Sequence, residues 1–282
     1  MRVLILGCGY LGRRVATLAQ QAGATVLATT RHPDRAAEFA RLGLQPVLCD
    51  VVAPESLRTL PEVDQVVYCV GLDRAAGVSM RRVYVEGLGN VLAALPGQPR
   101  IVHVSSTSVY GQTDGSPVDE SAPTEPLEES GQIVLDAEKL LCSIRPEARI
   151  LRFAGIYGPG RLIRARDLLA GRLLAIDPDK WLNLVHVDDG AAAVMAALAR
   201  GSAGVYNVAD GTPVRRRDFY TFLANLLGAP DPRFLPPPEP TPVSEKVNRQ
   251  IVARRLRDDL GVIPRFPSYA QGLPASLDTP RA

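Results

Sequence analysis

The sequence is poor in the residues that build metal centres and disulfide frameworks. Its 282 residues include three histidines and four cysteines. The cysteines form no CxxC pair, and no histidine lies at a metal-ligand spacing from them. Three of the four, Cys8, Cys49 and Cys69, lie in or beside apolar runs, where a free cysteine behaves as a small hydrophobic residue. We therefore expect no metal site and a reducing, cytoplasmic environment.

Long hydrophobic runs are also missing. No apolar stretch approaches the roughly 20 residues that a helix needs to cross a bilayer, so we expect no membrane association. The N-terminal segment 1–12 has the apolar character of a signal peptide, but Gly7, Gly9 and Gly12 interrupt it and two arginines follow. A buried first strand explains this segment better.

Lysine is scarce, and the charge is nearly balanced. The chain has 32 basic residues, of which only Lys139, Lys180 and Lys246 are lysines, and its formal net charge is +2. This distribution indicates no concentrated basic surface, which argues against a nucleic-acid-binding protein. With 46% hydrophobic and 22% charged residues, the composition is typical of a soluble globular protein. The length allows one large core, or a core with a smaller lobe.

Short apolar segments alternate with helix-like segments along most of the chain. Repetition of this strand–helix unit predicts a parallel sheet that helices cover on both faces. The predicted fold class is α/β, a Rossmann-type doubly wound parallel sheet with a small α/β C-terminal lobe. The proline-rich stretch 236–242 predicts an exposed loop. The seven strand-like segments are residues 2–7, 24–30, 45–50, 64–71, 100–106, 148–153 and 204–209.

Gly7, Gly9 and Gly12 form a GxGxxG motif between the first strand-like segment and the first helix-like segment. In a dinucleotide-binding turn the three glycines have separate tasks: a tight turn, the approach of backbone to pyrophosphate, and close packing of helix on strand. The pyrophosphate then lies at the positive end of the helix. The motif predicts a dinucleotide cofactor in this context, the alternative being a glycine-rich turn without a ligand.

The second strand ends without the acidic residue that usually binds the ribose 2′-hydroxyl of NAD. Thr29, Thr30 and Arg31 stand there instead. Hydroxyl groups and a cation suit a 2′-phosphate, which favours NADP(H) over NAD(H), unless Arg31 simply points to solvent. Asp50, at the end of the third strand, is expected near the adenine. The predicted cofactor-binding residues are Gly7, Gly9, Tyr10, Leu11, Gly12, Thr30, Arg31, Asp50, Val70 and Gly71.

Four segments resemble the extended short-chain dehydrogenase/reductases, the group that contains nucleotide-sugar epimerases and dehydratases. The resemblance implies a dinucleotide-binding domain formed by residues 1–157 and about 183–208, and a smaller substrate lobe formed by 158–182 and 209–282. It also implies that Ser106 hydrogen-bonds the reacting oxygen of the substrate. The four segments are VHVSSTSVYG at 102–111, LRFAGIYGPG at 151–160, NLVHVDDGAAAV at 183–194 and YNVADGTPVRRRDFY at 206–220.

The chain departs from that family at the catalytic residues. The family carries a tyrosine and a lysine four residues apart on one helix face, and the lysine assists proton exchange by the phenol. Glu138 matches a glutamate of the same family helix, and this register puts Ser130 and Val134 at the catalytic positions. Lys139 is rotated away from Val134 by about 140° and is expected to point elsewhere. The family's first glycine is also replaced, by Leu6.

Two functional classes therefore remain open. The first is an NADP-dependent oxidoreductase or epimerase with relocated acid–base chemistry, for which Ser106, Tyr110 and Tyr157 are the candidate residues. Its substrate would be an unknown small molecule, such as a nucleotide sugar or another carbonyl or hydroxyl compound. The second is a non-catalytic protein that senses NADP(H) and regulates a partner. Either protein is expected to be a monomer or a homodimer.

Overall fold

The computed structural model describes residues 1–278, and within them seven parallel strands form one sheet in the order β12-β7-β5-β4-β1-β2-β3. The order reverses between β1 and β4, as in a doubly wound sheet. The predicted α/β class is confirmed, and each of the seven strand-like segments contributes a strand. Their bounds are β1 Arg2–Leu6, β2 Thr25–Thr30, β3 Gln45–Leu48, β4 Gln65–Tyr68, β5 Arg100–Ser106, β7 Arg149–Phe153 and β12 Gly204–Val208.

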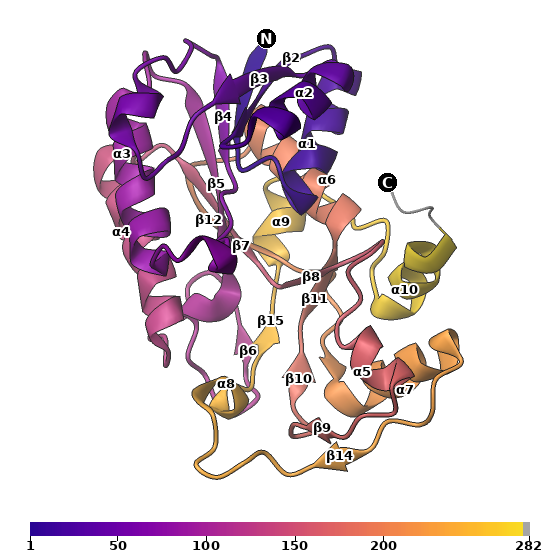
Figure 1. Ribbon diagram of the computed structural model, residues 1–282. Coiled ribbons are helices and arrows are strands. Elements are labelled where there is room, and N and C mark those ends of the chain that lie inside the picture. The colour runs from indigo at the N-terminus through magenta and orange to yellow at the C-terminus, as the bar shows by residue number, and fades with distance from the viewer. Residues whose placement is uncertain (279–282) are drawn as a thin grey trace.

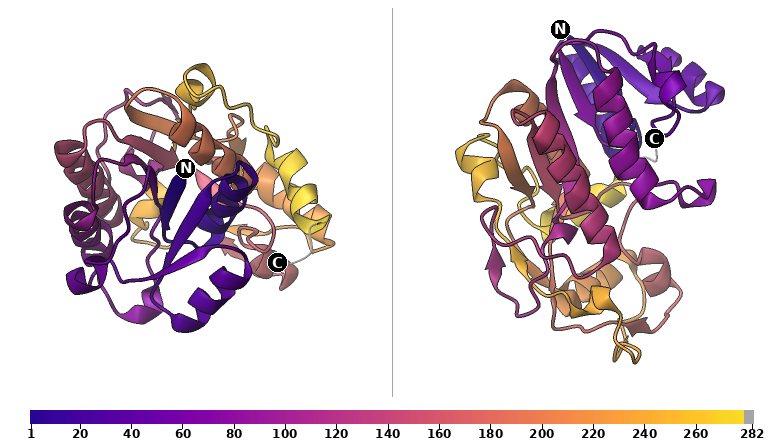
Figure 2. Two further views of the ribbon diagram at one scale, coloured as in Figure 1. Left: turned by 90° about the horizontal axis from the view of Figure 1, so that it is seen from above. Right: turned by 90° about the vertical axis from the view of Figure 1, so that its left-hand side faces the viewer.

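Helices cover both faces of this sheet (Figures 1 and 2). On one face α1 (Tyr10–Gln21), α2 (Pro33–Arg41), α6 (Val187–Ala199) and α9 (Arg254–Asp258) pack against the strands. On the other face lie α3 (Gly87–Ala94) and α4 (Glu129–Ile144). Residues 3 to 6 of β1 are fully buried because neighbours cover both sides of the strand. Strands that are buried on both faces have continuous apolar sequences, so they can be recognised from the sequence alone.

A smaller lobe lies beyond the carboxyl ends of the strands. Its core includes Leu168, Leu174, Phe219, Leu223 and Leu273. Its helices are α5 (Ala165–Leu169), α7 (Arg216–Leu227) and α10 (Tyr269–Asp278). Its short strand pairs are β9 (Leu174–Ala175) with β14 (Phe234–Leu235), and β10 (Trp181–Leu182) with β13 (Val214–Arg215).

Two further strand pairs connect the lobe with the sheet. One is β8 (Gly155–Tyr157) with β11 (Leu184–His186), and the other is β6 (Pro117–Val118) with β15 (Gln250–Ile251). The proline-rich segment 236–242 has no helix or strand and is mostly exposed, as predicted. It precedes the short helix α8 (Val243–Lys246).

The segment leading into α3 has an unusual geometry. Residues Arg82–Glu86 form a π-helical turn, η3, which continues directly into α3. π-helical turns are rare in proteins, and those that occur often lie at functional sites. In the same part of the chain, short 3-10 turns connect β3 with β4 (η1, Pro54–Leu57) and follow β4 (η2, Arg74–Ala76).

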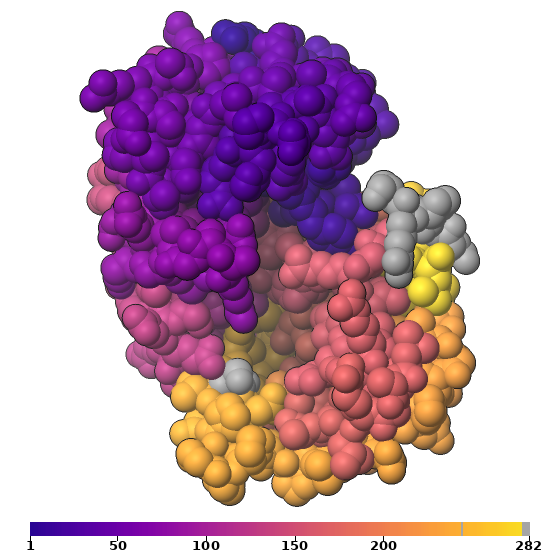
Figure 3. All heavy atoms as spheres, in the orientation of Figure 1, coloured from indigo at the N-terminus to yellow at the C-terminus, as the bar shows by residue number. Residues whose placement is uncertain are grey.

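A hollow opens between the sheet domain and the smaller lobe. In Figure 3 it lies between the indigo and purple atoms of the sheet domain and the pink and gold atoms of the lobe. Ligands of doubly wound folds bind at this edge of the sheet, next to the reversal of strand order. Across residues 1–278 no helix combines the length and apolarity that crossing a membrane requires.

Candidate cofactor and active site

The three glycines of the turn after β1 have three different surroundings. Gly7 has a φ of +87°, and a Cβ there would lie 2.4 Å from the carbonyl oxygen of Cys69. A Cβ on Gly12 would lie 2.7 Å from the Gly7 oxygen and 3.2 Å from Cys69 Sγ. Gly9 is different, since within the described chain nothing comes closer than 4.0 Å to its Cβ position. Gly7 and Gly12 are needed for folding, whereas Gly9 leaves space for a ligand.

The N-terminus of α1 begins at this open glycine. Gly9 is its N-cap, and no side chain in the described residues accepts a hydrogen bond from the first-turn N–H groups. These groups carry the positive end of the helix dipole. An uncapped helix N-terminus beside an open glycine fits the pyrophosphate of a dinucleotide.

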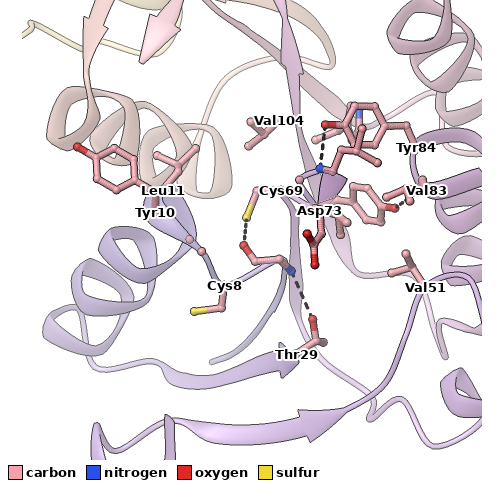
Figure 4. Close-up of a pocket in the computed structure, with 18 of the residues that line it drawn as sticks. Cys8, Tyr10, Leu11, Thr29, Val51, Cys69, Asp73, Val83, Tyr84 and Val104 are labelled. Carbon is pink, nitrogen blue, oxygen red and sulfur yellow. Dashed lines mark hydrogen bonds between the residues drawn. The ribbon is translucent and has the colours of Figure 1, made fainter. Parts of the chain in front are cut away.

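A cavity of about 730 Å³ runs along the edge of the sheet from this turn (Figure 4). Its volume is within the range of small-molecule and cofactor sites. All ten residues that the sequence predicts for cofactor binding line it. They come from the turn after β1, the end of β2, the loop after β3 and the end of β4. The structure therefore brings the whole predicted set together around one space.

Positive charge gathers at the end of the cavity formed by β2 and α2. Arg31 and Arg35 line it, together with Thr29, Thr30 and Asp50. The Arg35 Nη2 group donates to the carbonyl oxygen of Cys8 at 3.3 Å, which holds the guanidinium over the glycine turn. Both arginines are exposed, Arg31 directly after β2 and Arg35 in the first turn of α2. This end of the cavity, the adenosine end for a dinucleotide bound at the turn, presents two guanidinium groups.

The other end of the cavity is mostly apolar. Val134, Ala137, Phe153, Ala154 and Ile156 line it. Ser106, one of the three predicted catalytic residues, also lines it, at the carboxyl end of β5. The Ser106 oxygen accepts a hydrogen bond from the Ser108 N–H at 3.1 Å, which leaves its own proton available to a ligand. These apolar walls beside the Ser106 hydroxyl fit a flat nicotinamide ring and a substrate oxygen.

The helix α4 presents Val134 to this cavity, at the position that the family resemblance gives to a lysine. Ser130, one turn earlier, is half-buried, and its hydroxyl donates to Glu128 Oε2 at 3.2 Å. Lys139 is exposed, as expected from its rotation around the helix. In the part of the chain that the structure describes, no lysine lines the cavity.

Tyr110 lies outside the cavity, in a buried polar network. Its hydroxyl accepts from Arg152 Nη1 at 2.9 Å and donates to Asn207 Oδ1 at 2.9 Å. Arg152 also forms a buried ion pair with Glu138, at 2.7 Å between Nη2 and Oε2. Glu138 in turn accepts from the Ser105 hydroxyl. The network links β5, α4, β7 and β12, so Tyr110 has a structural task.

Tyr157 also lies outside the cavity and is fully buried. Its ring packs edge-on against His186, with 5.4 Å between ring centroids. A Cβ on Gly272 of α10 would lie 2.0 Å from the Tyr157 oxygen. Burial raises the pKa of Tyr157, and the nearby Asp210 and Asp189 raise it further. The structure thus brings Ser106, but neither Tyr110 nor Tyr157, to the predicted cofactor site.

The cavity wall also includes residues that the sequence did not predict, four of which matter for the chemistry of the site. Asp73 and Arg35 lie at the adenosine end, and Tyr84 and His103 lie deeper, towards Ser106. Burial lowers the pKa of His103 to about 4, so this imidazole is neutral near pH 7. Of these four, Arg35 could have been predicted, because it repeats the arginine at position 31 four residues later. The others come from segments without a recognisable motif.

Comparison with known proteins adds independent information. The chain matches the model of the NAD dependent epimerase/dehydratase family over residues 3–209. It is 31% identical over 246 residues to Protein YeeZ of Escherichia coli strain K12, which covers 83% of this chain and 86% of that protein. It is 29% identical, in an alignment of 309 residues, to the 3-diazoavenalumate denitrifying reductase of a Streptomyces species, covering 97% and 99% of the two chains.

One solved structure shows how closely the fold is shared. A UDP-glucose 4-epimerase from Thermotoga maritima, solved with UDP-glucose, superposes with a TM-score of 0.83. The match covers 99% of this chain and 98% of that chain, at 18% sequence identity. At this identity the likeness shows a common fold.

Proposed function

Because this chain belongs to the NAD-dependent epimerase/dehydratase family, we propose that it is an NADP(H)-dependent oxidoreductase acting on a carbonyl or hydroxyl group of a small molecule. The observation that carries the proposal is the continuity of one cavity from the glycine turn to Ser106. A dinucleotide bound at the turn has room to extend to a hydroxyl that can hold a substrate oxygen.

Two guanidinium groups support NADP(H) as the preferred cofactor. Arg31 and Arg35 line the adenosine end, and no carboxylate follows directly after β2. The carboxylate of Asp73 is paired with Arg31 at 3.0 Å. A 2′-phosphate gains charge-assisted hydrogen bonds from two arginines, whereas a 2′-hydroxyl does not.

The residues of the chain have separate tasks in this proposal. The first turn of α1 holds the pyrophosphate, and Val134, Ala154 and Phe153 shield the reacting end from water. Ser106 donates its hydroxyl proton in a hydrogen bond to the reacting oxygen of the substrate. When bound, the nicotinamide supplies or accepts a hydride.

The two parts of the fold divide this work. Residues 1–157 and about 183–208 hold the dinucleotide, and residues 158–182 and 209–282 hold the substrate, the last four residues lying outside the described chain. We place the substrate in the hollow between these parts (Figure 3). Nucleotide sugars and other carbonyl compounds are the proposed substrate classes, since the relatives include a UDP-glucose 4-epimerase and a reductase. Four unpaired cysteines in the described chain are consistent with a reducing, cytoplasmic location.

A second candidate follows from the apolar side chain at position 134. Without an ammonium group there, the protein could bind NADP(H) and report its redox state to a partner without turning over a substrate. The two candidates differ in one measurable property, since an oxidoreductase consumes NADPH when a carbonyl substrate is added and a sensor does not.

The test of the proposal is a binding titration followed by a turnover assay. We expect NADPH to stabilise the protein against thermal unfolding at lower concentrations than NADH. We then expect NADPH consumption with at least one member of a panel of aldehydes, ketones and 4-keto nucleotide sugars. Absence of stabilisation by any dinucleotide would contradict the family-based cofactor role, and binding without turnover on the panel would favour the sensor.

A further inference from the structure

Tyr84 occupies a position in the cavity wall that neither the motif nor the family resemblance marks. It lies on the π-helical turn η3, which packs against α4. The side chain is half-buried and lines the cavity together with Val134 and Ser106. Its ring also packs against the apolar cluster that contains Val134 and Ala154. A phenol is therefore present beside the position that lacks the catalytic lysine.

The hydroxyl of Tyr84 differs from those of the other tyrosines in the cavity wall. The Tyr10 hydroxyl donates to the Pro159 carbonyl oxygen at 3.1 Å, and the Tyr68 hydroxyl donates to the Val83 carbonyl oxygen at 3.4 Å. Tyr84 instead accepts a hydrogen bond, from the Leu72 N–H at 3.2 Å. Within residues 1–278 its own proton has no acceptor, so it remains available to a ligand.

The accepted bond also fixes where this proton is presented. The Leu72 N–H lies just beyond β4, and it holds the phenol oxygen at the edge of the sheet. In Figure 4 the ring of Tyr84 enters from the helix side, and its hydroxyl lies on the side of Val104. Val104 precedes Ser106 by two residues on β5 and lines the same cavity.

We propose that Tyr84 is the catalytic proton donor of this protein and that it serves carbonyl reduction, an inference that rests on the proposed function. Ser106 and Tyr84 both donate hydrogen bonds to the carbonyl oxygen of the substrate. As the carbonyl carbon accepts a hydride from the bound cofactor, the π pair of the C=O bond moves to oxygen, which takes the proton of Tyr84. The product is an alcohol, and water entering from the mouth of the cavity restores the proton of the phenol.

The missing lysine determines the favoured direction. A neighbouring cation favours the charged form of a phenol, and a lysine at position 134 would supply one. Val134 provides no cation. A protonated phenol serves a reduction, in which the site must supply a proton. Alcohol oxidation and epimerisation through a ketone begin with loss of a hydroxyl proton, so we expect both to be slow at neutral pH.

The first test removes only the hydroxyl. Tyr84→Phe keeps the ring and its packing, and we expect it to lower kcat for carbonyl reduction by about 10²-fold or more. The dissociation constant of NADPH should not change, which separates a proton donor from a residue that merely holds the cofactor. Tyr269→Phe is the matched control, because Tyr269 packs on Phe219 and Phe222 in the smaller lobe and does not line the cavity.

The second test needs no turnover. In protein labelled with carbon-13 at the tyrosine Cζ, the Tyr84 resonance is identified by its loss in Tyr84→Phe. We expect saturating NADP⁺ to shift this resonance, whereas 2′,5′-ADP, which fills only the adenosine end, should leave it in place. An unmoved resonance in the NADP⁺ complex, or full reductase activity in Tyr84→Phe, would overturn the inference and leave the cofactor role intact. If no dinucleotide binds the unmutated protein, the proposed function fails and the inference fails with it.

Discussion

Arg31 and Asp73 join the two sides of the cavity at its adenosine end, with 3.0 Å between Arg31 Nη2 and Asp73 Oδ2. Arg31 follows β2, and Asp73 lies in the loop after β4. The side chains remain 35% and 49% exposed, and an exposed pair of this kind contributes at most about 1 kcal/mol. A 2′-phosphate can therefore displace the carboxylate at small cost, so the pair does not block cofactor binding.

Replacing Arg31 by aspartate should reverse the cofactor preference. Arg31→Asp removes a charged donor and adds a second carboxylate beside Asp73, so NADPH affinity should fall by about 10-fold to 100-fold, from about 1.5–3 kcal/mol per charged hydrogen bond. NADH affinity should change less. Isothermal titration of both cofactors measures this. Arg41→Asp, at the end of the following helix α2 and away from the cavity, is the control, and equal titration curves for both cofactors in the unmutated protein would count against the NADP(H) assignment.

Removing the negative charge of Asp73 should have the opposite effect. Asp73→Asn frees Arg31 for the phosphate, while the amide oxygen can still accept from the Ala75 N–H, as Asp73 Oδ1 does at 3.1 Å. We expect NADPH to bind up to about five-fold more tightly, the equivalent of roughly 1 kcal/mol, and NADH to be unaffected. A parallel gain for NADH would show that the carboxylate does not act through the 2′ position.

The three glycines should respond differently to a side chain. Gly9→Val places a branched group in open space where the pyrophosphate must approach, so cofactor binding should disappear while the fold survives. Gly12→Val should instead destabilise the protein, because its Cβ would meet the Gly7 oxygen at 2.7 Å. Thermal unfolding with and without NADPH separates the two outcomes. Persistent stabilisation of Gly9→Val by NADPH would mean that the phosphates bind elsewhere.

Restoring the family's catalytic pair tests the register of α4. Ser130→Tyr combined with Val134→Lys should raise turnover on the carbonyl panel by a factor within about 10²–10⁴, the usual range of general acid–base assistance. Each single variant should gain much less, because the family's tyrosine and lysine act as a pair on one helix face and either one alone leaves the pair incomplete. Lys139→Ala, at an exposed position, should leave all rates unchanged. Equal gains from the single and double variants would show that the two positions do not act together.

Asp210 should make stability depend on pH. Burial, with a smaller contribution from Asp189, raises its pKa from 3.8 to about 7, although the Thr212 N–H opposes this. Between these values the folded protein binds a proton that the unfolded chain releases, so this group's stabilisation is complete below pH 4 and is lost as pH rises to 7. Asp210→Asn should flatten the dependence by up to about 1.4 kcal/mol per pH unit and stabilise the protein at pH 8.

Urea unfolding at a series of pH values checks this expectation. Asp231→Asn, at an exposed loop position, is the matched control and should leave the pH profile unchanged. Parallel profiles for the unmutated protein and Asp210→Asn would show that the buried carboxyl does not titrate in this range.

The sequence predicted the sheet, and it predicted a set of residues that gather around the cavity, because both depend on local patterns. Strands buried on two faces are apolar throughout, and the spacing of Gly7, Gly9 and Gly12 is imposed by the turn itself. Tyr110 and Tyr157 adjoin recognisable motifs, but position along the chain does not give the direction of a side chain. The hydrogen-bond partner of Tyr110, Asn207, lies 97 residues further along the chain. A local sequence pattern does not predict such a long-range contact.

Tyr84 could not be found by helical periodicity. It lies in a segment that reads as an ordinary helix, whereas a π turn inserts an extra residue and rotates the side chains that follow. The hydrogen bond from Leu72 that orients the phenol also joins two separate segments. Only the folded arrangement brings Tyr84 into the wall of the same cavity as Val134.

The buried network around Glu138 has a consequence for protein engineering. It ties α4 to three strands through the buried side chains of Ser105, Arg152 and Tyr110. Removing one member of the buried Arg152–Glu138 ion pair is expected to lower the free energy of unfolding by about 3–5 kcal/mol. The helix therefore has little freedom to slide. Side chains at positions 130 and 134 can therefore be exchanged without a change of register. The chain offers a rigid host in which alternative catalytic groups can be installed one at a time and compared on an unchanged backbone.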